Sequence, residues 1–173
     1  MKESPSATSR DQNAEPSTFA LALLNGRHIA TLATHRADGS IHLAAIWYLY
    51  QDGLLYFPTS STSQKARNVR GNPTASAMID TRVPGQEQGV AVAGVATIID
   101  GSRGRDLVAQ AQQRYLTAKA LADPTIGSAY TAFDDVVIAL SPQRWTTWDI
   151  AQMNRDNFDG RLGVESGYLY PYD

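Results

Sequence analysis

The sequence has 173 residues, a formal net charge of −2 and no cysteine. A chain of this length can fold as one domain, and the lack of cysteine excludes thiol catalysis, iron–sulfur clusters and cysteine-ligated zinc. The charge balance gives no reason to expect nucleic acid, and no apolar run reaches the roughly 18 residues of a membrane span. With no secretory signal at the start either, a cytoplasmic protein is expected.

Residues 1–16 are polar and show no hydrophobic periodicity, which predicts a disordered tail. Ser17 or Thr18 can then cap a short helix that carries apolar side chains. Gly26 is expected to end this helix, because glycine is common just after the last helical turn.

Residues 27–59 contain three β-rich runs, separated by Asp38-Gly39 and Asp52-Gly53. Asp-Gly between apolar runs is the strongest short-range signal of a β-hairpin, so this part predicts an antiparallel meander.

Both faces of the first hairpin are apolar if Asp38-Gly39 is a two-residue turn. One face would carry Ile29, Thr31, Ala33, Ala44, Ile46 and Tyr48, and the other Ala30, Leu32, Leu43, Ala45, Trp47 and Leu49. One face can fill a barrel, and the other needs cover from a helix, a second subunit or a flat ligand. The same register places His35 opposite His42, and two imidazoles are too few for a closed metal site.

Two further strands are expected at residues 74–82 and 89–100, and a longer helix begins near Ser102. Gly94, inside the second of these strands, marks either a bulge or a close approach of another backbone. Residues 135–150 indicate a strand, a proline-marked bend and another strand.

About six short strands with two or three inserted helices predict a mainly β domain over residues 17–150, built as a closed antiparallel barrel. Residues 151–173 are polar and are interpreted as a C-terminal arm or tail. Asp134 and Asp135 are neighbours in a strand, so they point to opposite faces and indicate only a charged strand start. No catalytic nucleophile or acid–base set is apparent, which assigns any chemistry to a bound cofactor.

The stretch "TSSTSQKARN", residues 59–68, joins a row of hydroxyl groups to a helix start. A helix N-terminus offers unpaired N–H donors and a partial positive charge. Thr59, Ser60 and Ser63 can add hydroxyl donors, and Lys65 supplies a full charge. The functional interpretation is a phosphate clamp; the alternative is an ordinary serine cap on a solvated basic helix.

The order of these motifs resembles the flavin/deazaflavin oxidoreductases of the pyridoxamine 5'-phosphate oxidase-like superfamily, which share the FMN-binding split β-barrel. The resemblance covers about residues 18–148, and its most specific part is "SQKARN" at residues 63–68 with "NP" at 72–73. It implies a homodimer of split antiparallel β-barrels with the cofactors at the subunit seam.

The resemblance also implies roles for individual residues. The phosphate of the cofactor would contact Thr59, Ser60, Ser63 and Lys65, with Asn68 nearby, and its ring system would lie along Ala45, Ile46 and Trp47. Gln64 is also expected to be a cofactor-binding residue. No residue is assigned a catalytic role.

The similar family members commonly use the deazaflavin coenzyme F420, whose anionic tail would suit Arg67, Arg70 and Arg82; others use FMN. The expected activity is hydride transfer from the deazaflavin to a small electron-poor organic substrate. An FMN-dependent oxidase or reductase and a non-catalytic flavin- or haem-binding protein are the alternatives. The carboxyl-terminal substrate signature of true pyridoxamine phosphate oxidases has no counterpart here, which argues against vitamin B6 oxidation.

Overall fold

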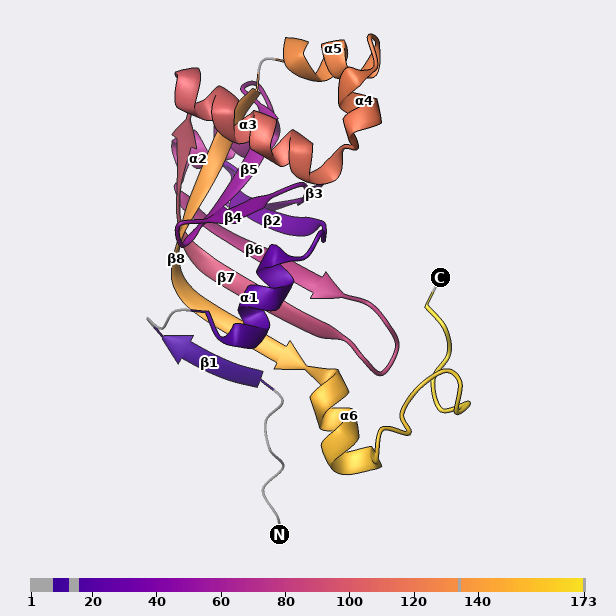
Figure 1. Ribbon diagram of the computed structural model, residues 1–173. Helices are drawn as coiled ribbons and strands as arrows, with labels where there is room; N and C mark the ends of the chain where they lie inside the picture. Colours follow the sequence, from indigo (N-terminus) through magenta and orange to yellow (C-terminus); the bar gives the residue numbers. More distant parts are fainter. Residues whose placement is uncertain (1–7, 13–15, 134, 173) are drawn as a thin grey trace.

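The computed structural model describes residues 8–12, 16–133 and 135–172. Their strands are β1 (Thr8–Gln12), β2 (Ala30–His35), β3 (Ile41–Ile46), β4 (Leu49–Gln51), β5 (Leu54–Ser60), β6 (Thr74–Thr81), β7 (Gln88–Ile99) and β8 (Asp135–Asp149). Their helices are α1 (Thr18–Asn25), α2 (Gln64–Gly71), α3 (Gly101–Tyr115), α4 (Ala118–Ala122), α5 (Ile126–Ala132) and α6 (Ile150–Phe158). Helices α3, α4 and α5 gather at one end of the sheet and α6 lies at the other (Figure 1).

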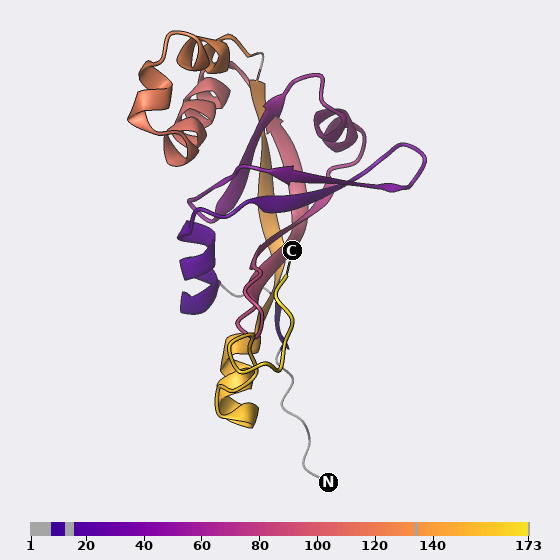
Figure 2. The same ribbon diagram turned by 90° about the vertical axis from the view of Figure 1, so that its right-hand side faces the viewer.

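The strands pair antiparallel in the order β3-β2-β6-β7-β8-β5-β4. The two ends of this order are consecutive in the chain, because β3 runs into β4 through only Trp47 and Tyr48. The sheet therefore curls until its ends meet at this corner (Figure 2). The fold is the predicted one, a mainly β split antiparallel barrel with inserted helices.

The loop of the first hairpin holds three residues rather than the predicted two. A backbone N–H of Arg36 donates to the carbonyl of Ser40 (2.8 Å), and Gly39 between them has a left-handed φ of 84°. A turn followed by a left-handed glycine is the common three-residue hairpin loop. The second hairpin has the expected two-residue turn, since Asp52 and Gly53 both have positive φ.

This extra loop residue shifts the register of the first hairpin by one position. Thr34, and not His35, lies opposite His42, so the predicted histidine pair is wrong. The two faces are still both apolar, but their members change. The buried face carries Ala30, Leu32, Thr34 and Ile46, whereas the other face exposes Ile29, Ile41, Leu43 and Ala45.

Gly94 lies at an irregularity of the ladder between β7 and β8. The register shifts between Ala93 and Gly94, which pair with Arg144 and Pro142, so β8 carries one additional residue. The 15-residue β8 stays continuous, and the predicted break into two strands is replaced by this bulge. Pro142 fits there because a bulge tolerates a residue without an N–H donor.

Tyr48 connects the closing corner of the barrel to α1. Its ring is fully buried, and its hydroxyl donates to the carbonyls of Leu23 and Gly26, both at 3.2 Å. The two acceptors are at the C-terminal end of α1, where carbonyls lack partners within the helix. At the other end of α1, Ser17 accepts from Ala20 N (3.2 Å), which confirms the predicted cap.

Tyr48 should make the protein sensitive to alkaline pH. Burial raises the pKa of its hydroxyl from 10.0 to about 12. The stability linked to this shift is fully present below pH 10.0 and is lost as the pH rises toward 12, by about 3 kcal/mol in total. Urea unfolding across this pH range should show that loss in the wild type. The Tyr48→Phe variant should lack it, and parallel alkaline losses in both proteins would contradict the assignment.

The chain ends differ from the simple tails that composition indicates. Within the segment interpreted as a disordered tail, residues 8–12 form β1, which pairs with β8; residues 1–7 and 13–15 lie outside the described residues. Pairing at a sheet edge uses main-chain groups and needs no apolar pattern. The C-terminal segment begins with α6, where Asn154 Nδ2 donates to the carbonyls of Gly85 (3.2 Å) and Leu162 (2.7 Å). No helix among the described residues is long and apolar enough to cross a membrane.

Candidate functional site

A cavity of about 560 Å3 lies between the C-terminal ends of β3 and β5 and the helices α3 and α5. Its lining residues are Ile29, Ala45, Ile46, Trp47, Pro58, Thr59, Val108, Gln112, Tyr130, Phe133 and Asp135. Four of the residues assigned to a cofactor from the sequence, Ala45, Ile46, Trp47 and Thr59, thus line one cavity. The cavity has two walls, one of strand residues and one of helix residues.

Trp47 is fixed by aromatic contacts from the helices. Its indole stacks on Tyr115 at a centroid distance of 5.0 Å and an angle of 4°, and on Tyr130 at 5.9 Å and 13°. The hydroxyl of Tyr115 donates to the carbonyl of His28 (2.7 Å). Because β3 ends at Ile46, the chain bends here, so Trp47 meets the helices while Tyr48 enters the core.

Thr59 and Ser63 join the end of β5 to the start of α2. Thr59 is buried, and its Oγ1 donates to Ser63 Oγ (3.0 Å). Ser63 Oγ in turn accepts from Ala66 N (3.2 Å), so Ser63 is the N-cap of α2. The serine cap predicted as the alternative is therefore present, and the remaining N–H groups at the start of α2 have no acceptor within the helix.

Gln64 and Asn68 take part in a chain of amide hydrogen bonds. Gln64 Nε2 donates to Asn68 Oδ1 (2.7 Å), and Asn68 Nδ2 donates to Thr34 Oγ1 (2.9 Å). Asn68 and Thr34 are buried, so this chain fastens α2 to β2. Ser60 is exposed, and its hydroxyl lies 3.1 Å from that of Thr62.

Lys65 is half-buried in the first turn of α2. Burial lowers the pKa of its ammonium group below the usual 10.5, and the negative charge of Asp135 opposes this shift. Burial, with the positive charges of Arg36 and Lys65, lowers the pKa of His42. His42 Nδ1 is buried without a hydrogen-bond partner among the described residues. Lys65 is thus a partly desolvated cation between the first hairpin and Asp135.

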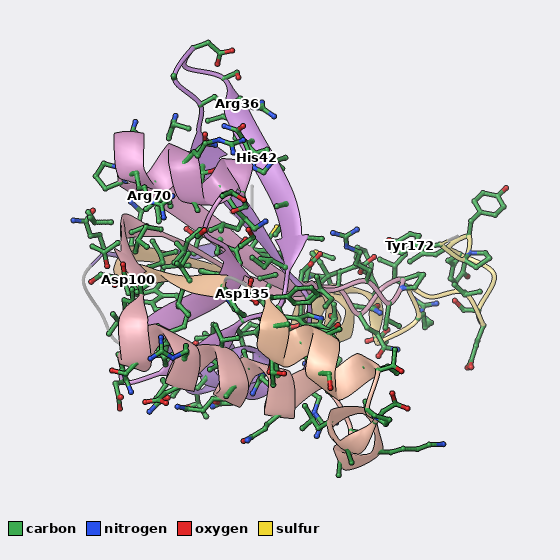
Figure 3. All side chains as sticks on the ribbon, turned by 90° about the horizontal axis from the view of Figure 1, so that it is seen from above. Arg36, His42, Arg70, Asp100, Asp135 and Tyr172 are labelled. Carbon is green, nitrogen blue, oxygen red and sulfur yellow. The ribbon has the colours of Figure 1, made fainter. Side chains whose placement is uncertain are left out.

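Asp135 belongs to the site, which corrects its interpretation as a mere charged strand start. It lines the cavity, pairs with Ser60 across β5 and β8, and acts electrostatically on Lys65. Seen from above, Asp135 lies between the hairpin that carries Arg36 and His42 and the helices α3 and α5 (Figure 3). The sequence could not show this, since only the β5–β8 pairing brings the two segments together. Asp134 lies outside the described residues.

Neutralising Asp135 should strengthen anion binding next to Lys65. We expect Asp135→Asn to bind inorganic phosphate about two- to tenfold more tightly at low salt, because one repulsive charge is removed. As the pH rises, phosphate binding by the variant should also be lost at a lower pH than in the wild type, because Asp135 no longer raises the pKa of Lys65. Calorimetric titration across pH measures both effects. The exposed Asp156→Asn on α6 is the matched control, and unchanged phosphate affinity in Asp135→Asn would contradict the arrangement.

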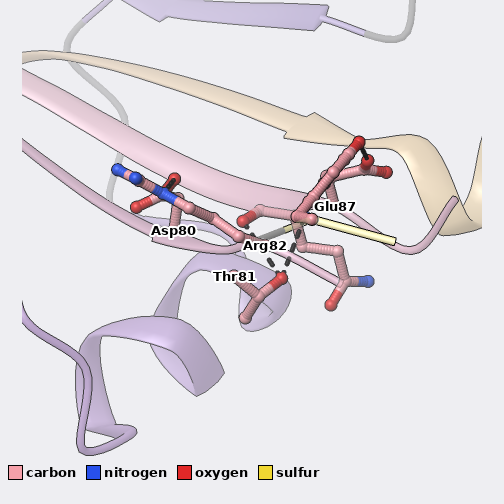
Figure 4. A network of polar contacts seen from close by, with 6 residues as sticks. Asp80, Thr81, Arg82 and Glu87 are labelled. Carbon is pink, nitrogen blue, oxygen red and sulfur yellow. Dashed lines mark hydrogen bonds and ion pairs between the residues drawn. The ribbon is translucent and has the colours of Figure 1, made fainter. Parts of the chain in front are cut away.

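The basic residues that follow Lys65 do not form one group. Arg67 donates to the carbonyl of Thr62, and Arg70 donates to that of Ser61 (2.7 Å), so both fold over the hydroxyl-rich loop. Arg82 is instead paired with Asp80 (3.0 Å) beyond the far end of β6 (Figure 4). An eight-residue strand spans roughly 25 Å. Arg82 therefore lies at the opposite end of β6 from α2, and its expected contribution to an anionic site stays a prediction.

Within the described ranges, no group of three or more histidine, aspartate or glutamate side chains is placed to hold a metal ion. The site instead combines hydrogen-bond donors, one partly desolvated cation and an apolar cavity. Such a donor set fits an anionic group attached to a flat apolar body.

Comparison with known proteins gives a family and a fold. The family model described as pyridoxamine 5'-phosphate oxidase matches residues 18–149. A conserved hypothetical protein from Mycobacterium tuberculosis is 27% identical, with a TM-score of 0.67 over 83% of this chain and 92% of that one. A protein described as an F420 reductase is 24% identical, with a TM-score of 0.57 over 75% and 97% of the chains. An FAD-binding protein from Mesorhizobium loti is 18% identical, with a TM-score of 0.56 over 82% of this chain and 97% of that one. The last two likenesses show the fold alone, and no curated protein matches the sequence significantly.

Proposed function

The chain belongs to the pyridoxamine 5'-phosphate oxidase family, and from this premise we propose that it is an oxidoreductase holding a phosphorylated flavin or deazaflavin. The observation that carries the proposal is the position of Lys65. It is a half-buried cation at the N-terminus of α2, and it interacts electrostatically with Asp135, which lines the same apolar cavity as Ala45 and Trp47. A partly desolvated lysine gains more from an anionic partner than one in bulk water does.

The proposed phosphate site would combine three kinds of hydrogen-bond donor. Lys65 supplies charge, the exposed hydroxyl of Ser60 supplies a donor, and the first turn of α2 supplies backbone N–H groups. Thr59, Ser63 and Gln64 are engaged within the protein, so their role is to hold the loop and the helix start in place. Asn68 helps to hold α2 in place through its hydrogen bond to Thr34 on β2.

The strand wall of the cavity would carry the ring system. Ala45 is exposed and small, and Ile46 next to it is almost fully buried, so a flat ring can approach the backbone of β3 closely. Trp47 would close the end of this surface, with its ring stacked on those of Tyr115 and Tyr130. Burial of a planar apolar body against such a surface is favourable.

The chain's own contribution to catalysis would be orientation and exclusion of water. When bound, a reduced deazaflavin would supply the hydride, and a proton from solvent would complete the reduction of the substrate. The helices α3 and α5 close one side of the cavity and limit the access of water. Two flat molecules held face to face react as if at high local concentration.

Coenzyme F420 is the proposed cofactor and FMN is the alternative. Arg67 and Arg70 are exposed on α2, and each guanidinium has more donors than its local contacts use. They would suit an anionic tail beyond the phosphate, which the deazaflavin has and FMN lacks. The shared fold with an F420 reductase supports this choice, and the fold shared with an FAD-binding protein keeps the flavin alternative open.

A homodimer is part of the proposal. The outer face of the first hairpin exposes Ile29, Ile41 and Leu43, with exposed fractions of 47%, 49% and 64%. β3 is also an edge strand, and exposed apolar edges favour association. A second copy on this face would lie next to Ala45, at the rim of the cavity.

Titration of purified protein with F420 and with FMN, followed by the fluorescence of each cofactor, tests the proposal. Saturable binding of F420 that is tighter than that of FMN supports it, and tighter binding of FMN selects the flavin alternative. Failure to bind either cofactor refutes the proposed function. Rapid mixing of the reduced complex with enones and quinones then distinguishes an oxidoreductase from a carrier, which would show no oxidation above the rate of the free cofactor.

A further inference from the structure

The last part of the chain is fixed to the sheet, although it lies outside the segment matched by the family model. We call residues 159–172, which follow α6, the tyrosine arm. Near its start, the backbone N–H of Leu162 donates to Asn154 Oδ1 on α6 (2.9 Å). Gly85, in the loop between β6 and β7, approaches so closely that a Cβ there would lie 2.1 Å from the carbonyl oxygen of Leu162. Main-chain contacts therefore hold the start of the arm against this loop.

The other end of the tyrosine arm returns to the same loop. The hydroxyl of Tyr172 donates to the carboxylate of Glu87, two residues beyond Gly85. The aromatic side chains of the arm are nevertheless uncovered, since the exposed fractions of Tyr168, Tyr170 and Tyr172 are 65%, 91% and 55%. Aromatic side chains are enriched where proteins meet, because each of them buries a large area. The arm thus presents tyrosines from a backbone that is already held in place.

The area of this aromatic surface is too small to hold a partner alone. With these exposed fractions the three tyrosines offer roughly 400 Å2, since one aromatic side chain can bury about 150–250 Å2. The outer face of the first hairpin offers less, because Ile29, Ile41 and Leu43 are smaller and about half exposed. A stable interface takes about 800 Å2 from each partner. The two surfaces together approach this area, whereas neither does so alone.

The two surfaces are placed so that one chain does not bury them against each other. Seen from above, the first hairpin, which carries Arg36 and His42, and the tyrosine arm, which carries Tyr172, extend on adjacent sides of the molecule (Figure 3). The side chains that form the two surfaces are uncharged, so their contact desolvates no charge. In a twofold dimer, a contact between the hairpin of one copy and the arm of the other forms twice. A second copy of this chain is therefore a partner that can cover both surfaces at once.

We propose that the tyrosine arm of each copy packs on the outer face of the first hairpin of a second copy, with Tyr168 and Tyr170 as the main contacts. The proposal deepens the homodimer of the proposed function, on which it rests, by naming the two surfaces that meet. Ala45 lies on the same face of the hairpin and lines the cavity. The arm of one copy thus lies beside the cavity of the other, and each site is bordered by both chains.

Cross-linking of engineered cysteines tests which surfaces meet, since the chain has no cysteine of its own. The variants Leu43→Cys and Tyr170→Cys, carrying different affinity tags, are coexpressed and treated with a short bismaleimide. We expect a covalent dimer that contains one copy of each variant, and little product from either variant alone. Coexpression of Leu43→Cys with Gln110→Cys, which is exposed on α3, is the matched control and should give no covalent dimer.

Analytical ultracentrifugation adds a second readout, the strength of the dimer. The double variant Tyr168→Ser/Tyr170→Ser should weaken the dimer at least about tenfold, because tyrosines in interfaces often contribute strongly to binding. Both side chains are exposed, so a thermal melt should show an intact fold. The double variant Tyr168→Phe/Tyr170→Phe should preserve the dimer, since the rings and not the hydroxyl groups make the contact.

The outcomes separate this inference from the proposed function. A dimer that gives no cross-link between Leu43→Cys and Tyr170→Cys, or that is as strong in the double serine variant as in the wild type, overturns the role of the arm and leaves the homodimer standing. Cross-linking of Tyr170→Cys to itself also overturns that role, because the arms would then pack on each other. A monomeric wild type overturns the role of the arm and the proposed homodimer together. The proposed oxidoreductase is decided separately, by the titrations with F420 and FMN.

Discussion

Replacing Lys65 by alanine is expected to weaken cofactor binding at least about tenfold, which is the loss expected for one charge-assisted contact to phosphate. Lys65 is half-buried, so its attraction for an anion is less screened by water than that of a surface lysine. The fold should persist, because Lys65 fills no part of the two hydrophobic clusters. Titration of the variant with F420 and FMN measures the effect, and a thermal melt checks the fold.

The exposed Lys119→Ala on α4 provides the matched control, since it removes the same charge away from the α2 start. It should bind the cofactor as the wild type does. The pH profile adds a second readout. Burial lowers the pKa of Lys65, so affinity should begin to fall with rising pH below the usual lysine value of 10.5. Unchanged affinity in Lys65→Ala would remove the basis of the phosphate site.

Replacing Gly94 by alanine is expected to destabilise the fold by about 3 kcal/mol or more, because the added methyl group has no room. A Cβ at this position would lie 2.0 Å from the carbonyl oxygen of Ser141 and 2.9 Å from its carbonyl carbon. These are backbone atoms of β8 at the bulge, so relief requires that the two longest strands separate. Urea unfolding of the variant and the wild type measures the difference.

Gly71→Ala serves as the matched control for that experiment. Gly71 ends α2, is exposed, and has no heavy atom within 4 Å of the position that its Cβ would take. Its replacement should change stability by about 0.5 kcal/mol or less. If Gly94→Ala unfolds at the same urea concentration as Gly71→Ala, the close approach of β7 and β8 is not what keeps this residue a glycine.

Local signals in the sequence predicted the fold well. Asp52-Gly53 forms the expected tight turn, Ser17 and Ser63 cap the expected helices, and the apolar pattern gives most of the strands. The strand β1 was not predicted, and β8 was predicted as two strands. The register of the first hairpin was wrong by one residue. Asp-Gly suits both two- and three-residue loops, and alternating small apolar residues on both faces do not favour one register over the other.

The candidate site was predictable only where it lies within one stretch of chain. The segment from Thr59 to Asn68 carries its own cap and donors, so its local structure follows from the sequence. Asp135 and Tyr130 could not be found in this way. They reach the cavity through the pairing of β5 with β8 and the packing of α5 on Trp47, which are contacts between segments far apart in the chain.

The two-residue corner between β3 and β4 has a consequence for how this protein can diversify. Trp47 faces the cavity and Tyr48 faces the interior, so the first position is constrained by ligand contact and the second by core packing. A substitution of Trp47 can therefore change which ligands the cavity binds, while Tyr48 preserves the packing at the closing corner of the barrel. The corner is a place where evolution, or an engineer, can alter selectivity without reopening the architecture.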